Sequence, residues 1–126
     1  MGENKCEQYL IELKLSHSCI APSMWRVDDP ENSLIGVAVA HVDPLVIVSA
    51  AVMELPEPQK RLELFTELLT LNVNGLVHGA YGIENDQIIL VDTLEYATMD
   101  FPEFRATLEA FSLALSQHYP VLSRYR

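Results

Sequence analysis

The sequence has few cysteines and few basic residues, and each shortage excludes a class of protein. Its 126 residues contain only two cysteines, Cys6 and Cys19, which are too few for a disulfide scaffold and are typical of a reducing cytoplasm. The sequence has eight Lys and Arg residues and 18 Asp and Glu residues, so its formal net charge is -10. An acidic surface repels the phosphates of nucleic acids and of anionic membranes. We therefore expect neither a nucleic acid nor an anionic membrane as a partner, whereas the charge is compatible with a polypeptide partner.

The sequence also lacks an uninterrupted apolar stretch that could cross a membrane or serve as a signal peptide. Its longest apolar run, residues 34–55, has His41, Asp43 and Pro44 near its middle, which predicts two strands joined by a turn. The N-terminal MGENKCEQ has no apolar stretch, so we expect a cytoplasmic protein without a signal peptide. The 49% hydrophobic content predicts one domain over residues 1–126 that folds without a metal or a disulfide.

Apolar periodicity and turn residues predict an α+β fold, an antiparallel sheet packed with helices in the order α-βββ-α-ββ-α. Links of hairpin length join the predicted strands, so neighbouring strands run antiparallel. Asn85-Asp86 is such a link, and Asp100 followed by Glu103 is the capping-box pattern that begins a helix. Gly75 tolerates the left-handed backbone that closes a helix. The predicted elements are helices over residues 3–16, 59–73 and 102–119 and strands over residues 24–27, 34–42, 45–53, 77–83 and 87–92.

The central helix, predicted over residues 59–73, carries two apolar stripes, whereas packing on one sheet needs only one. The stripe expected to cover the sheet consists of Leu62, Phe65, Leu69 and Val73. The stripe expected to contact a second copy or a docked partner consists of Leu64, Leu68 and Leu71. We therefore expect a homodimer or a docked partner on this helix. The alternative is that a single chain buries both stripes.

Two further apolar residues, Ile11 and Leu15, fall outside the apolar face of the first predicted helix. Isolated apolar side chains are common on protein surfaces. Contiguous ones mark contact sites. These two residues are therefore either ordinary surface residues or part of a second surface that binds a client polypeptide.

No residues of the sequence have the spacing of a catalytic or metal site. The four histidines lie in different predicted elements, and none has the partner at i+3 or i+4 that holds zinc on a helix. We therefore expect no enzyme and no cofactor. The alternative is a small ligand-binding protein or enzyme with a pocket between sheet and helices. Its polar groups would meet only in the folded chain, around His41, His78 and Asp92.

Four segments of the sequence resemble those of one known family. They are ELPEP before the central helix, LLTLNVN at its end, HGAYGIENDQIILVDTL through the hairpin and FRATLEAFSLALSQHYPVL in the last helix. Together they resemble the type III secretion chaperone-like superfamily, and within it the YbjN-like proteins, over essentially the whole chain.

This resemblance implies a small, acidic, cytoplasmic protein with the α-βββ-α-ββ-α fold and no catalytic residues. It implies dimerisation through the central helix and the adjoining strands. It also implies that an extended effector segment is held on apolar patches of the sheet and of the first helix. The ending HYPVL is more similar to the YbjN-like branch, whose bacterial members are regarded as sensory or stress regulators.

Overall fold

The computed structural model describes residues 4–126 and contains one sheet with helices packed against it. The helices are α1 (Lys5–Glu12), α2 (Pro58–Asn74), α3 (Phe101–Gln117) and α4 (Tyr119–Leu122), and single 3-10 turns lie at Pro30–Asn32 and Ser123–Tyr125. The strands are β1 (His17–Ala21), β2 (Met24–Asp29), β3 (Leu34–Val42), β4 (Leu45–Glu54), β5 (Ala80–Glu84) and β6 (Gln87–Glu95). The predicted α+β fold class is confirmed, and the structure adds β1 and α4. No helix within residues 4–126 is long and apolar enough to span a membrane.

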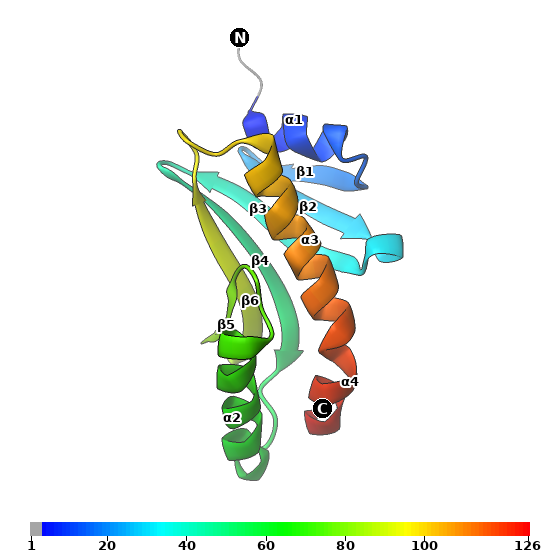
Figure 1. Cartoon of the computed structure of the whole chain (residues 1–126), viewed down its shortest axis with the longest axis vertical. Helices are drawn as coiled ribbons and strands as arrows, with labels where there is room; N and C mark the ends of the chain where they lie inside the picture. Colours follow the sequence, from blue (N-terminus) through cyan, green and yellow to red (C-terminus); the bar gives the residue numbers. More distant parts are fainter. Residues whose placement is uncertain (1–3) are drawn as a thin grey trace.

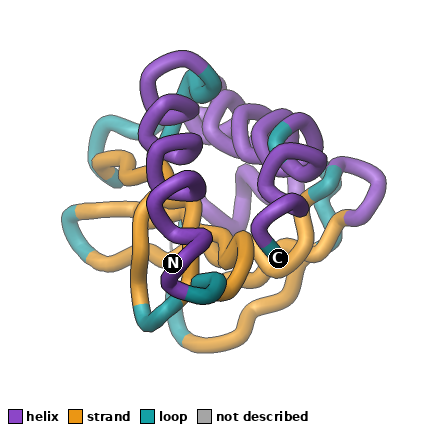
Figure 2. Tube along the Cα trace, turned by 90° about the horizontal axis from the view of Figure 1, so that it is seen from below, coloured by secondary structure: helices purple, strands orange, loops and turns teal. Residues whose placement is uncertain are grey.

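The six strands lie in the spatial order β1-β2-β3-β4-β6-β5, and all neighbours are antiparallel. In Figure 1, α3 runs along the sheet, with α1 near one of its ends and α2 near the other. Figure 2 shows the helices gathered mainly on one side of the strands. The turn between β5 and β6 has φ angles of 52° at Asn85 and 62° at Asp86. Positive φ at both residues matches the twist of a tight hairpin, so the predicted turn is confirmed.

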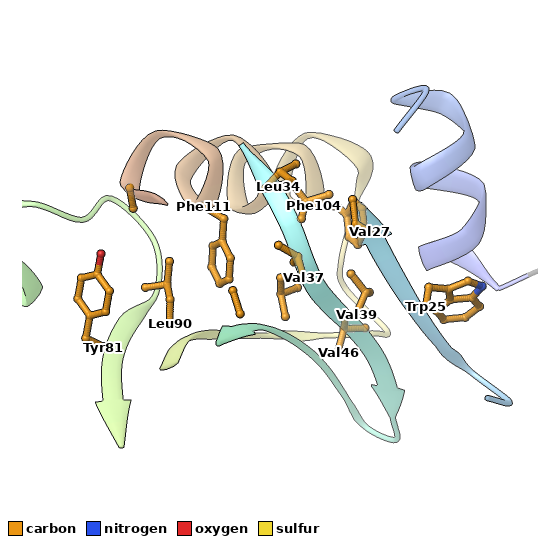
Figure 3. Close-up of a cluster of buried hydrophobic side chains, with 14 of the residues drawn as sticks. Trp25, Val27, Leu34, Val37, Val39, Val46, Tyr81, Leu90, Phe104 and Phe111 are labelled. Atoms are coloured by element: carbon orange, nitrogen blue, oxygen red, sulfur yellow. The ribbon is translucent and has the colours of Figure 1, made fainter. Parts of the chain in front are cut away.

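The core lies between α3 and the inner face of the sheet. Val37 and Val39 of β3, Val46 of β4, and Phe104 and Phe111 of α3 are fully buried, and Figure 3 shows them gathered between helix and strands. Val37 and Val39 are two residues apart because alternate side chains of a strand point to the same face. The phenylalanines are seven residues apart, which places them on one side of a helix.

Helix α3 begins with the predicted capping box. The Asp100 carboxylate accepts a hydrogen bond from the Glu103 amide at 2.9 Å, and the Glu103 carboxylate accepts one from the Asp100 amide at 3.0 Å. The two bonds satisfy amide groups that the helix itself leaves free. The helix ends at Gln117. Pro120 lies in the first turn of α4, where its missing amide costs little.

Several boundaries differ from the predicted ones. Strand β5 begins at Ala80 rather than at residue 77, and α3 ends at Gln117 rather than at residue 119. Helix α1 ends at Glu12, earlier than predicted, and Glu3, with which the predicted helix begins, lies outside the described residues. Gly75 follows α2 with φ -111°, so the predicted left-handed closure is wrong. A glycine is needed at position 75 for a different reason, which is that a side chain would not fit. A Cβ atom would lie 2.9 Å from Leu71 Cδ2 and 3.1 Å from His118 Nε2.

Candidate functional site

The two apolar stripes of α2 differ in exposure in the opposite sense to the prediction, except that Phe65 is half-buried against the core, as predicted. Leu64 is 0% exposed and Leu68 is 5% exposed, while Leu71 is half-buried against the core. The prediction that these three leucines face a partner is therefore wrong, because the chain itself covers them. The exposed residues, named here the outer stripe, are Leu62, Leu69 and Val73, with exposed fractions of 79%, 66% and 80%.

The orientation of α2 is fixed by a polar residue on its inner side, Asn72. Its side-chain oxygen accepts a hydrogen bond from the Tyr81 amide at 2.7 Å, and its side-chain nitrogen donates to the Tyr81 carbonyl at 3.3 Å. Tyr81 lies in the edge strand β5, so Asn72 takes the place of a neighbouring strand there. Leu64 and Leu68 precede Asn72 by eight and four residues and share its side of the helix. The pairing of the Asn72 side chain therefore turns both leucines inward. A pattern of apolar residues does not show this pairing, because Asn72 is polar.

A second apolar surface lies where α1 ends. Ile11 is 58% exposed, and Leu15 is half-buried against the core. Both residues line an open hollow of about 600 Å³. Leu15 also lines a groove of about 500 Å³ between α3, the segment that follows α1 and the start of β3. Leucines make up the apolar part of that groove: Leu13, Leu15, Leu34, Leu108 and Leu113. The structure thus brings the two predicted client-binding residues to one hollow, and their role stays a prediction.

Strand β1 gives this surface an open backbone edge. The Asp28 amide donates to the Ser16 carbonyl at 2.9 Å, and His17 lies opposite Val27. In an antiparallel ladder this pattern turns the amide and carbonyl of His17 and of Cys19 away from β2. No strand within residues 4–126 pairs with that side of β1. His17 also lines the hollow that contains Ile11, so the open edge adjoins the apolar surface.

Comparison with known proteins assigns the chain to a family. The CesT_Tir_1 family matches residues 3–126. The chain belongs to the CesT_Tir_1 family. The resemblance to secretion chaperones and YbjN-like proteins is thereby confirmed at the level of superfamily and fold. No curated protein sequence matches this CesT_Tir_1 chain.

Solved structures share the fold of this CesT_Tir_1 chain at low identity. YbjN from E. coli has a TM-score of 0.65 at 15% identity, over 96% of this chain and 93% of its own. An uncharacterised protein from Methanothermobacter thermautotrophicus has a TM-score of 0.63 at 15% identity, over 97% of each chain. A chain of the ExsC-ExsE complex has a TM-score of 0.52 at 15% identity, over 98% of this chain and 96% of its own. These likenesses show a common fold.

The alternative site around His41, His78 and Asp92 is not assembled in this CesT_Tir_1 chain. His78 and Asp92 line one hollow of about 590 Å³, which does not include His41. The Asp92 carboxylate there accepts a hydrogen bond from the Thr107 hydroxyl at 3.1 Å. Within residues 4–126 no three His, Cys, Asp or Glu side chains are placed to hold a metal ion.

His41 has a different environment, at the start of α1. Its ring stacks on Tyr96 with centroids 3.8 Å apart. Its Nδ1 lies 2.8 Å from the Asn4 side-chain nitrogen, and its Nε2 lies 2.9 Å from an oxygen of Asp43. The Asn4 amide nitrogen donates to Nδ1, so Nε2 carries the proton and donates to Asp43. Asn4 also caps α1 through the Cys6 amide. His41 thus holds α1 in place.

Proposed function

We propose that the protein is a non-enzymatic, chaperone-like module that binds a segment of a partner polypeptide and forms a homodimer. The observation that carries the proposal is membership of CesT_Tir_1, a type III chaperone family, over residues 3–126. One neighbour in fold is a complex of two proteins, ExsC-ExsE. A second support is that the chain leaves two apolar surfaces uncovered, on α2 and beside β1. The proposal places the protein in the cytoplasm, where its two free cysteines would stay reduced.

The outer stripe of α2 is the proposed contact between two copies. Burying Leu62, Leu69 and Val73 would contribute roughly 1.5 to 3 kcal/mol each, relative to full exposure. The three side chains lie within about one-third of the helix circumference, since positions separated by seven and four residues share a side. Net negative charge on both copies opposes association. Salt screens exposed charges beyond about 8 Å at physiological ionic strength, so burial of the stripe outweighs that repulsion.

The test of the homodimer is sedimentation equilibrium on the wild type and on Leu69→Glu. We expect a dimer for the wild type at micromolar concentration and a folded monomer for Leu69→Glu, because a carboxylate in a dry contact is costly. Gln117→Glu is the control, since it adds the same charge at an exposed position of α3. A wild type that is monomeric, or a Leu69→Glu variant that stays dimeric, would contradict the proposed contact.

The surface beside β1 is the proposed site for the partner segment. An extended segment can pair with the open edge of β1, while its side chains enter the hollow lined by Ile11 and Leu15. The test places a photo-crosslinking amino acid at position 11 in source cells, with the exposed neighbour Glu12 as the control position. We expect position 11 to cross-link a distinct polypeptide that position 12 does not. Equal products from both positions would reject this surface.

A further inference from the structure

His118 is buried where three elements meet. It is 6% exposed and lies between the end of α3 and the start of α4. Its Nδ1 lies 2.6 Å from the Tyr81 hydroxyl of β5. Its Nε2 lies beside Gly75, at the end of α2, so that a Cβ atom added to Gly75 would be only 3.1 Å from it. One imidazole therefore joins α2, β5 and α4.

The hydrogen bond to Tyr81 favours the neutral ring. With the ring neutral, the Tyr81 O–H can donate to Nδ1. With the ring protonated, Nδ1 can only donate, so the Tyr81 hydroxyl must turn to accept. Its own proton then loses its partner, which is unfavourable in a buried place. Burial raises the pKa of Tyr81 to about 12, so this hydroxyl does not ionise to accept the proton.

The charged groups around His118 do not compensate a positive ring. His118 lines a hollow of about 360 Å³ together with Tyr119 and Arg126, and its lining contains no Asp or Glu side chain. Arg126 is of the same sign as a protonated ring. On α2, the carboxylate of Glu67 already pairs with Arg124, at 3.6 Å. Burial lowers the pKa of His118 from its ordinary 6.5, against a smaller opposing effect of the Gly75 backbone.

We propose that His118 is an acid-sensitive latch, whose protonation releases the end of α2 from β5 and α4 while the rest of the sheet stays folded. The released ring is free in solvent and binds a proton more readily than the latched ring. Acidification below about pH 6.5 therefore favours the released state. At higher pH both states are neutral and the latch stays closed. Because α2 carries the outer stripe, release in acid would also weaken the homodimer, and this consequence rests on the function proposed above.

The test is hydrogen exchange of backbone amides followed by mass spectrometry at pH 7.5 and 5.5, corrected for intrinsic exchange rates. For the wild type we expect exchange of residues 71–77 to rise by up to about tenfold in acid, because each pH unit over which only the released state binds the proton favours release tenfold. Exchange of β3 and β4 should not change. The variant His118→Gln keeps an acceptor for the Tyr81 hydroxyl without titrating, so its exchange should be independent of pH. His78→Gln, at an exposed histidine, should behave as the wild type.

Tyr81→Phe is the second variant for this test and is used if His118→Gln does not fold. It removes the opposing donor, so residues 71–77 should exchange faster at pH 7.5 and respond less to acid. Equal acid sensitivity in wild type and His118→Gln would overturn the latch, and so would acid-induced exchange that rises equally in β3 and β4. Sedimentation at both pH values separates the two proposals: local release in a protein that is monomeric throughout supports the latch and refutes the dimer.

Discussion

The orientation of α2 can be tested by truncating two neighbouring leucines on opposite sides of the helix. Leu68 is 5% exposed and Leu69 is 66% exposed. Leu68→Ala leaves a cavity in the core, which typically costs about 2 to 5 kcal/mol. Leu69→Ala removes a side chain that is mostly in water already, and such changes usually stay within about 0.5 kcal/mol. The two variants have the same composition, so only position distinguishes them.

The assay is urea unfolding followed by circular dichroism. Measurement at low protein concentration, where association contributes little, reports the single chain. For a slope of about 2 kcal/mol per molar urea, Leu68→Ala should lower the unfolding midpoint by roughly 1 to 2.5 M. Leu69→Ala should leave it nearly unchanged. At high concentration the wild type should gain stability from association, and Leu69→Ala should gain less.

Equal destabilisation by both variants at low concentration would refute the reasoning, because it would mean that both sides of α2 are buried within one chain. A stable Leu68→Ala variant beside an unstable Leu69→Ala variant would restore the orientation expected from the sequence. Either result would remove the outer stripe as a contact between copies.

Three further predictions concern single side chains. Asp100→Ala should destabilise the protein by about 0.5 to 2 kcal/mol in thermal unfolding, because the amide of Glu103 loses its cap; Asp100→Ser, which still caps, should recover most of this. Asn72→Ala should cost about 1 to 3 kcal/mol by leaving the backbone groups of Tyr81 unpaired, and an unchanged unfolding midpoint would contradict their role. A thiol reagent should modify exposed Cys19 rapidly in the native protein and Cys6 only on unfolding, in both cases without prior reduction. The reason is that Cys6 is buried and that burial raises its pKa to about 11. Rapid modification of two thiols per native chain would contradict this prediction.

Local chemistry made part of this fold predictable from sequence. The turn at Asn85 and Asp86 and the cap at Asp100 each depend on residues within a few positions of one another, and the structure has both. The long strands β3 and β4 were predictable because they are rich in β-branched residues and bounded by turns. In contrast, β1 has the sequence HSCIA and is largely exposed, so it has no apolar alternation. Only its pairing with β2 makes it a strand.

The candidate site was less predictable, because its orientation depends on contacts between segments. Both sides of α2 are apolar, so periodicity alone does not say which side faces inward. The decision is made by Asn72 bonding to Tyr81. That contact spans the link of residues 75–79 between α2 and β5 and has no periodic signature. Ile11 was identified as lying off the buried face of the first helix, and it is exposed. The open edge of β1 beside it could not be foreseen without β1.

The hydrogen bonds from Asn72 make the two edges of the sheet unequal. At β5 the outward amide and carbonyl of Tyr81 already have partners, whereas β1 presents free groups. A fibre that grows strand by strand needs two receptive edges on every molecule, because a molecule with one such edge terminates the fibre when it joins. At Tyr81 the edge of β5 is therefore closed to an added strand, whereas the edge of β1 is not. One amide side chain both packs α2 against the sheet and makes β5 a poorer edge than β1 for strand-by-strand growth.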